Sequence, residues 1–294
     1  MKKLRIILAM VIVGTIGIFV EYIGLPSLVI ATARAWGGAL FMLIVMFFLR
    51  KKVHWDKVKK NAVFLIISGI SMGGNWIFLF ESYKYVSVAI AILCDYMAPV
   101  FVIMLSPFLL KEKITWKKML CIGGAIYGMF LISGIVGNVV ADIRGVALGL
   151  LSAVMYCSMV ICNKKIKDMD GIEKTFCQMS VAAGVIITYT LLTVDIGNLI
   201  FTRQSIILLI TVGIVHTGIA YLLFIPVISQ LPAITTSVLS YIEPVVAILT
   251  SALILKEALY FQQIIGTILI LGSTLLCEAP LDLRKIFKRI TKDT

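Results

Sequence analysis

Five polar residues stand at similar depths in long apolar stretches of the sequence. Asn75, Asp95, Tyr156, His216 and Glu243 each follow the start of such a stretch by about 9 to 13 residues. If each stretch crosses a membrane as a helix, these side chains meet near the bilayer midplane. An ionisable group there costs ~2.5–3.5 kcal/mol and therefore faces a path or a partner. The five residues predict a polar layer inside a helix bundle.

The members of this layer suit different chemistry. The carboxyl groups of Asp95 and Glu243 are candidate proton or cation sites, because buried carboxyl groups are common functional groups. Glu243 has an alternative role, which is a hydrogen bond to the backbone that Pro244 leaves unpaired. Asn75 suits a hydrogen bond between helices better than contact with a ligand. His216 suits a proton relay and a core histidine equally well.

Aromatic residues adjoin the polar layer: Trp76, Tyr96, Tyr221 and Tyr241. Their rings offer an apolar face with one polar tip, which suits amphipathic organic solutes and cations held against a ring. For each of them, packing is the alternative role. Together with the five polar residues they make up the predicted substrate or translocation pathway.

One arginine also lies inside an apolar stretch. Arg34 is about eight residues from the end that we expect to face outward. Because long basic side chains can extend toward the membrane surface, we expect an outward structural ion pair with Glu21 or Glu81.

A short motif offers an alternative function. Gly69-Ile70-Ser71-Met72-Gly73 has the G-x-S-x-G pattern of a nucleophile elbow. That elbow needs a strand-to-helix turn, which a continuous apolar stretch does not provide. Glycines four residues apart also let membrane helices approach closely, which favours a packing role. An intramembrane serine hydrolase using Ser71 and His216 is the alternative to the functions considered below.

Other catalytic signatures are missing from the sequence. It contains no H-E-x-x-H, P-loop or dinucleotide-binding pattern. We therefore expect neither a metal nor an organic cofactor, and no enzymatic activity.

The elements that position these residues are ten apolar stretches. About 20 apolar residues at 1.5 Å per residue suffice to cross the hydrocarbon. The composition agrees, with 61% hydrophobic and 14% charged residues. The first stretch superficially resembles a secretory signal but lacks a cleavage site, so we interpret it as a span. The approximate spans are 5–21, 26–49, 62–81, 86–110, 118–136, 145–163, 173–194, 205–225, 232–255 and 259–278.

The basic residues predict the orientation of these spans. With ten spans both termini lie on one side, and 22 of the 27 basic residues then fall in connections on that same side. Because Lys and Arg near span ends are retained in the cytoplasm, both termini are predicted to be cytoplasmic, in the plasma membrane. This topology accounts for the net charge of +12. Anionic lipid of the bilayer is the expected partner of these clusters, and no nucleic acid is needed.

The two halves of the sequence are related. Residues 96–100 (Tyr-Met-Ala-Pro-Val) match residues 241–245 (Tyr-Ile-Glu-Pro-Val) at an offset of 145, and Leu-Lys-Glu follows in both copies at 110–112 and 255–257. The predicted units are residues 1–136 and 145–278, with a basic cytoplasmic tail at 279–294. Each unit holds five spans, an odd number, so the copies are inverted. Inverted repeats are typical of secondary transporters, whose substrate site lies between the halves.

The paired prolines, Pro99 and Pro244, fall in the fourth and ninth spans. Proline removes a backbone hydrogen bond and kinks a helix, which frees a carbonyl that needs a partner in hydrocarbon. Such a kink either lines a water-filled path or serves packing alone. Their symmetric positions favour a shared role.

At these residues the chain resembles the EamA-type members of the drug/metabolite transporter superfamily. The resemblance rests on Pro99-Val100 and Pro244-Val245, each followed by Lys-Glu about a dozen residues later, and on Arg34 and Glu243. Lys111 and Lys256 stand where the family often has glycine. The resemblance covers the whole chain and implies an all-α integral membrane protein of ten transmembrane helices in two inverted five-helix repeats.

The resemblance also implies a function. We expect a secondary transporter that moves small organic metabolites by alternating access, with export the family's broad default. Amino acids, amines and drug-like solutes are the candidate cargo. Proton coupling is one candidate driving force, and a substrate gradient is the other.

Overall fold

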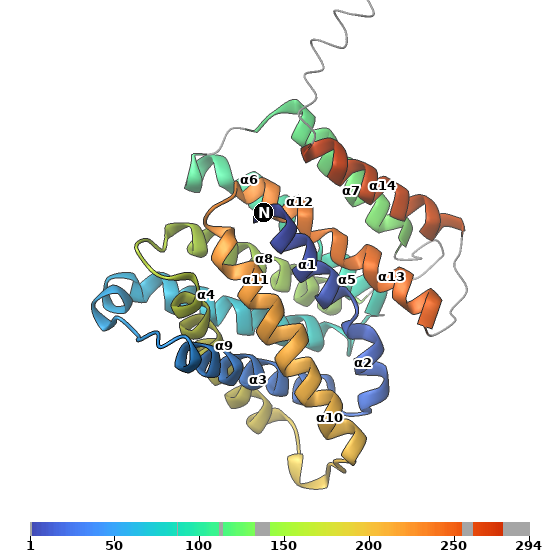
Figure 1. Ribbon diagram of the computed structural model, residues 1–294. Coiled ribbons are helices and arrows are strands. Elements are labelled where there is room, and N and C mark those ends of the chain that lie inside the picture. Colours follow the sequence, from blue (N-terminus) through green and yellow to red (C-terminus); the bar gives the residue numbers. More distant parts are fainter. Residues whose placement is uncertain (1, 87, 112–113, 133–141, 255–260, 279–294) are drawn as a thin grey trace, which may run out of the picture.

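The computed structural model describes residues 2–86, 88–111, 114–132, 142–254 and 261–278, and those residues form helices without any strand (Figure 1). The first half holds α1 (Lys2–Gly14), α2 (Ile16–Ile23), α3 (Ser27–Phe48), α4 (Trp55–Ser82), α5 (Val88–Asp95), α6 (Ala98–Leu110) and α7 (Trp116–Ile132). The second half holds α8 (Ile143–Lys165), α9 (Gly171–Thr193), the 3-10 helix η1 (Ile196–Asn198), α10 (Arg203–Thr211), the π-helix η2 (Val212–Ile219), α11 (Ala220–Ile228), α12 (Ala233–Ser240), α13 (Ile242–Ile254) and α14 (Phe261–Glu278).

Six helical segments are long and apolar enough to cross a membrane. They are Lys2–Ile23, Ser27–Phe48, Trp55–Ser82, Ile143–Lys165, Gly171–Thr193 and Arg203–Ile228. The other four predicted spans hold shorter helices among the described residues: α5 with α6, then α7, α12 with α13, and α14. The chain is therefore a multi-pass helical protein, and the count of ten spans stays a prediction. The basic tail, 279–294, lies outside the described residues, as do Glu112, Lys256 and Glu257.

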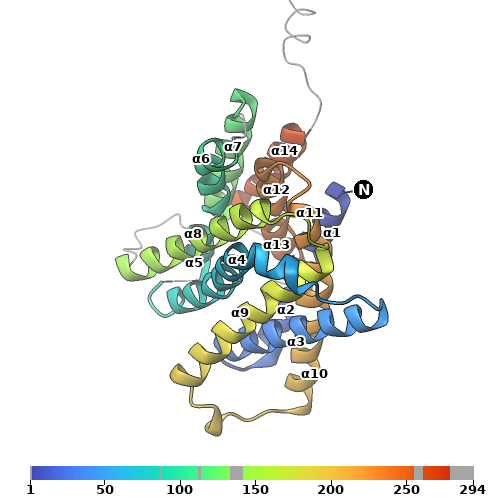
Figure 2. The ribbon, with the colours of Figure 1, turned by 90° about the vertical axis from the view of Figure 1, so that its left-hand side faces the viewer.

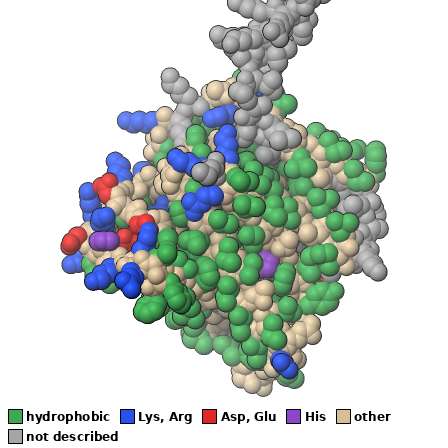
Figure 3. All heavy atoms as spheres, viewed as in Figure 1, with side chains coloured by type: hydrophobic (Ala, Val, Ile, Leu, Met, Phe, Trp, Pro, Cys, Tyr) green, Lys and Arg blue, Asp and Glu red, His purple; other side chains and the backbone are tan. Residues whose placement is uncertain are grey.

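The outer surface is apolar over the face shown in Figure 3, where Lys and Arg gather mainly at the left edge, around the start of α4. Large apolar side chains point outward on several helices: Phe47 on α3 is 79% exposed, Phe108 on α6 is 81% and Leu192 on α9 is 80%. Soluble proteins rarely expose apolar surface on this scale. Hydrocarbon is the environment in which such a surface is stable.

The longest helices form the centre of the bundle. α4 packs along α8 and α9, while α3 packs along α9 and η2. α1 packs against α11, α12 and α13. α7 and α14 pair with each other, and Figures 1 and 2 both show them side by side at the edge of the bundle.

Glycines allow several of these close approaches. A Cβ added at Gly69 would lie 2.5 Å from Val181 Cβ and 2.9 Å from the carbonyl oxygen of Gln178 on α9. At Gly128 it would lie 2.7 Å from the carbonyl oxygen of Gly266 on α14. The packing role predicted for Gly69 is confirmed, and Gly128 allows a second close approach of the same kind.

Two connections meet at one end of the bundle. Lys51 Nζ, between α3 and α4, donates to Asp170 Oδ2, between α8 and α9, at 2.5 Å. Asn61 Nδ2 donates to the Lys167 carbonyl oxygen at 3.0 Å. The His54 backbone N–H, beside Lys51, donates to Glu173 Oε1 at 2.6 Å. The loop before α4 and the loop before α9 therefore lie on the same side of the molecule.

Two predicted spans are interrupted at matching places. α5 ends at Asp95 and α6 starts at Ala98, and α12 ends at Ser240 while α13 starts at Ile242. Pro99 and Pro244 lie in the first turn of α6 and α13, where a missing N–H costs no helical hydrogen bond. The kink predicted at each proline is therefore replaced by a break two to three residues earlier.

The two breaks touch each other. Tyr241 Oη donates to the Tyr96 carbonyl oxygen at 3.1 Å, and the ring centroids are 6.2 Å apart. These tyrosines are the equivalent residues of the sequence repeat. The carbonyl freed by the first break thus finds its partner at the second.

Candidate translocation site

An acidic group lies at the C-terminal end of α5. Asp95 Oδ1 accepts hydrogen bonds from Asn75 Nδ2 of α4 at 2.7 Å and from Ser152 Oγ of α8 at 2.6 Å. Asn75 also donates to the Ser152 carbonyl oxygen at 3.0 Å. The predicted proximity of Asn75 and Asp95 is therefore present in the structure, through direct contact.

Ser152 was not predicted as a partner of Asp95. Serine is common in membrane helices, and nothing marks this one alone. One signal was available, because Ser152 lies four residues before Tyr156 and therefore on the same face of α8.

A second acidic group lies just after the break between α12 and α13. Glu243 lies near Tyr96 and Asp95. Nearby, Tyr156 Oη and Ser240 Oγ are 3.2 Å apart. Residues from α8, α12 and α13 therefore meet the C-terminal end of α5 at the crossing of the two broken helices.

Arg34 belongs to this centre, which corrects the expectation of an outward ion pair. Its side chain is buried, its guanidinium carbon lies 4.4 Å from the centroid of the Trp76 ring, and its Nε points at Thr217 Oγ1 at 3.4 Å. Glu81 pairs instead with Lys84 at 2.7 Å. The π-helix η2 and the middle of α4 thus hold the arginine inside the bundle, where extension to the surface is blocked.

Aromatic rings continue from Arg34 toward the second repeat. The Trp76 and Tyr221 rings meet edge to face with centroids 6.0 Å apart, and Tyr221 meets Phe224 in the same manner at 6.4 Å. Arg34 lies within electrostatic range of both Tyr221 and Glu243. The structure therefore brings the predicted aromatic residues Trp76 and Tyr221 together with a cation that the prediction left out.

His216 contacts other elements than the two carboxyl groups do. Its Nε2 lies 3.0 Å from Thr15 Oγ1, at the junction of α1 and α2, and its ring contacts Phe19 with centroids 4.5 Å apart. Its Nδ1 is enclosed without a hydrogen-bond partner. The contacts of His216 thus run to the first span, whereas Asn75, Asp95, Tyr156 and Glu243 gather around the α5–α6 and α12–α13 breaks.

These contacts also separate Ser71 from His216. Ser71 Oγ donates to Ser158 Oγ of α8 at 3.1 Å, while the recorded partner of the His216 ring nitrogen is Thr15. A serine hydrolase needs a base within about 3.2 Å of its nucleophile. The geometry therefore gives no nucleophile–base pair.

The residues of the centre differ in accessibility. Asp95, Tyr96, Tyr156, Tyr221 and Glu243 each keep part of their surface accessible. Tyr241 is fully enclosed, with its hydroxyl used by the Tyr96 carbonyl. Tyr241 thus holds the crossing together, whereas the other five border accessible space. Within the described residues, no group of three or more His, Cys, Asp or Glu is arranged to hold a metal ion.

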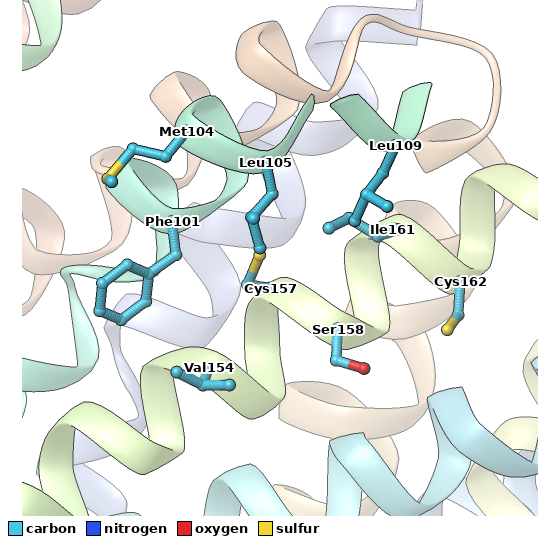
Figure 4. A pocket seen from close by; sticks show the side chains of 9 residues that line it. All are labelled: Phe101, Met104, Leu105, Leu109, Val154, Cys157, Ser158, Ile161 and Cys162. Carbon is cyan, nitrogen blue, oxygen red and sulfur yellow. The ribbon is translucent and has the colours of Figure 1, made fainter. Parts of the chain in front are cut away.

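A separate pocket of about 330 Å³ lies between α6 and α8 (Figure 4). Its lining is apolar except for Ser158 and comprises Phe101, Met104, Leu105, Leu109, Val154, Cys157, Ser158, Ile161 and Cys162. Met104 is 60% exposed, so the pocket opens at the outer surface of the bundle. It lacks the charged groups of the central cluster.

Comparisons with known proteins agree on the class. The chain is 28% identical over 273 residues to the uncharacterized transporter YxxF of Bacillus subtilis, covering 91% of this chain and 86% of that protein. It is 26% identical over 274 residues to an uncharacterized transporter of Archaeoglobus fulgidus, covering 92% and 94%. A crystal structure with 17% sequence identity has the same fold, with a TM-score of 0.82 over 94% of this chain and 97% of that one. The model of the EamA-like transporter family matches twice, at residues 3–134 and 143–278, so the chain belongs to the EamA-like transporter family.

Proposed function

We propose that this protein is a secondary transporter that moves a small organic solute through its centre by alternating access. The observation that carries the proposal is the convergence of polar groups from both halves at two crossing, broken helices. Asp95 and Tyr96 come from the first half, and Tyr156, Tyr221 and Glu243 from the second. Discontinuous helices that meet between repeats are where transporters of this general design bind their cargo.

The accessibility of the carboxyl groups supports a path through the centre. Asp95 and Glu243 lie inside a bundle with an apolar exterior, yet both keep accessible surface. A carboxylate that faces hydrocarbon is costly, so such groups face water or a partner. A water-filled path between the halves gives both carboxyl groups that environment.

The mixture of groups suits an amphipathic cargo. Trp76 and Tyr221 supply apolar ring surface, and Arg34 lies against Trp76. We propose amino acids, amines or related metabolites as the solute class, carried across the plasma membrane. Glu243 is the proposed proton site, because it lies beside the crossing and near Tyr96.

The test is a comparison of cells with and without the protein. Intracellular and extracellular metabolites are measured in both, and each solute whose distribution changes is then tested for counterflow in proteoliposomes containing the purified protein. We expect at least one small organic solute to exchange. Empty liposomes are the control, and the absence of protein-dependent exchange of every such solute would contradict the proposal.

A further inference from the structure

Arg34 has more hydrogen-bond donors than the protein uses. A guanidinium carries five N–H donors in a planar fork. The one hydrogen bond that Arg34 makes is from Nε to Thr217 Oγ1, and its length of 3.4 Å is beyond the usual range of 2.7–3.2 Å. Arg34 forms no ion pair with a carboxylate of the described residues. Its donors are therefore largely unmatched by protein.

The unmatched donors are not fully enclosed by protein. The fully enclosed side-chain atoms without a partner are Asn163 Oδ1, Gln178 Oε1, His216 Nδ1 and Ser237 Oγ, and they include no nitrogen of Arg34. The terminal nitrogens of Arg34 therefore keep accessible surface, although the residue as a whole is only 8% exposed.

The neighbours of Arg34 fix its orientation. The guanidinium carbon lies over the Trp76 ring, 4.4 Å from its centroid, and this cation–π contact uses none of the N–H donors in a hydrogen bond. Thr217 donates its own hydroxyl proton to the Val212 carbonyl oxygen, so the lone pair is available to Arg34 Nε. The free edge is the part of a guanidinium that binds a carboxylate through two parallel hydrogen bonds.

The carboxyl groups near Arg34 limit which charges a bound solute can carry. Glu243 and Asp95 lie in the same centre, and Glu243 is within electrostatic range of Arg34 without pairing with it. A solute with only negative charge would meet these carboxyl groups unfavourably. A solute with a carboxylate and a positively charged group separated by a short distance matches both.

We propose that Arg34 binds the carboxylate of a small amphoteric solute, that Glu243 faces its positively charged group, and that Trp76 and Tyr221 contact its apolar part. This inference rests on the proposed transport function and narrows its cargo to one class. A structural arginine would instead use its donors on backbone carbonyls or on a paired carboxylate, because a charge inside the membrane is costly when unpaired. Arg34 does neither.

The test uses matched probes on the purified full-length protein. Alanine, leucine and phenylalanine are each compared with their carboxamide and with the amine that lacks the carboxyl group, by thermal unfolding in detergent across a concentration series. We expect at least one parent amino acid to stabilise the protein, and its amide and amine to bind about 10- to 100-fold more weakly, the loss expected for a hydrogen-bonded charge. Binding of an amide or amine as strongly as its parent would overturn the inference, as would failure of all three parents to bind.

Variants then assign the effect to this residue. Arg34→Gln should weaken binding of the stabilising amino acid by the same factor, while Arg34→Lys, which keeps the charge but loses the fork, should retain part of it. Arg203→Gln, at an exposed position at the start of α10, is the matched control and should bind as the wild type does. Gel-filtration profiles and unfolding midpoints without ligand establish that each variant is folded. Wild-type affinity in folded Arg34→Gln would overturn the proposal.

The transport measurements distinguish a failure of this inference from a failure of the proposed transport function. If the proteoliposomes exchange an amine or a neutral solute and Arg34→Gln leaves that exchange unchanged, the carrier function stands and the carboxylate inference fails. If no solute exchanges at all, the transport function itself fails.

Discussion

Among single residues, Glu243 is the one on which coupling to a proton gradient should depend. Glu243→Gln keeps the shape of the side chain but cannot release a proton. We therefore expect the variant to lose accumulation driven by a pH gradient in proteoliposomes and to retain part of its solute exchange. Glu21→Gln, at an exposed position on α2, is the control and should accumulate normally. Full pH-dependent accumulation by Glu243→Gln would assign the residue a structural role and make Asp95 the next candidate.

Ser71 should be replaceable. Its hydroxyl makes one hydrogen bond, to Ser158 Oγ at 3.1 Å, and an interhelical bond of this kind contributes about 0.6 kcal/mol on average. Ser71→Ala should therefore transport at nearly the wild-type rate, with a small loss of stability. Transport is measured by counterflow and hydrolysis with chromogenic ester substrates. An esterase activity that Ser71→Ala abolishes would contradict this prediction and restore the hydrolase alternative.

Asp170, outside the membrane-spanning helices, makes stability depend on pH. Burial alone would raise its pKa, but hydrogen bonds from Lys51 and from the Ile172 N–H outweigh that effect and hold the pKa below its ordinary value of 3.8. A carboxyl group with a lowered pKa stabilises the fold above its unfolded pKa, and this contribution disappears as the pH falls below 3.8 and through the folded pKa.

The corresponding substitution is Asp170→Asn, which keeps an N-cap oxygen for α9 but loses the ion pair. At pH 7 it should lower stability by less than about 1 kcal/mol, because both partners are partly exposed. Thermal unfolding in detergent from pH 7 to pH 3 should show the difference shrinking as the pH falls below 3.8. Asp168→Asn is the matched control, since Asp168 and Lys60 are both more exposed and 3.4 Å apart. An equal loss at pH 7 in both variants would contradict the prediction.

For helices, the sequence predicted positions well and interruptions poorly. Apolar length located the long helices because hydrophobicity alone decides which segments enter the bilayer. The breaks at residues 96–97 and 241 depend on a tertiary contact, since Tyr241 supplies the donor that the Tyr96 carbonyl needs. The π-helix η2 and the interruption at Thr15 likewise leave no periodic signal, because the surrounding sequence is apolar throughout. The positions of His216 and Glu243, and the contact that Arg34 makes with Thr217, depend on these irregular turns. The site could therefore be predicted only in part.

The pairing of α7 with α14 gives a prediction for a single helix contact. Gly128→Ala puts a Cβ 2.7 Å from the Gly266 carbonyl oxygen, and backbone cannot move aside as a flexible side chain can. We expect a loss of about 1–3 kcal/mol, typical of overpacking. Gly123→Ala on the same helix is the matched control, because nothing lies within 4 Å of its added Cβ. Unfolding in mixed micelles with increasing SDS measures both, and equal stability of the two variants would show that α7 and α14 do not pack this closely.

At the scale of the whole molecule, helix contacts between the two halves come in equivalent pairs. α4 of the first half packs on α8 of the second, and α11 of the second half packs on α1 of the first. The breaks of α5–α6 and α12–α13 meet each other, as do α7 and α14. Contacts of this kind are expected when two five-span units are related by a two-fold axis that passes near Tyr96 and Tyr241. The matching of the family model to both halves supports this relation, and the inversion of one unit remains our proposal.

The orientation of the molecule gives the last prediction. The loops before α4 and α9 lie at one end, joined by Lys51 and Asp170, and both loops are rich in lysine. The positive-inside rule places this end in the cytoplasm. Because α9 crosses the bundle from there, η1 at Ile196–Asn198 should face outward.

Cysteine labelling tests this orientation directly. Four native cysteines, at 94, 121, 157 and 162, are buried and Cys177 is partly buried, so an introduced exposed cysteine reacts faster than these five. The labelling background carries Cys277→Ser, because the side chain at 277 lies outside the described residues. In intact cells a membrane-impermeant maleimide should label Asn198→Cys, whereas Asp56→Cys should react only after permeabilisation. Reporters near Asn138 and after Thr294, both outside the described residues, should be external and cytoplasmic respectively. Labelling of Asp56→Cys in intact cells with protection of Asn198→Cys would reverse the orientation. Labelling of both in intact cells would overturn the span assignment itself, because one crossing by α9 must separate the two positions.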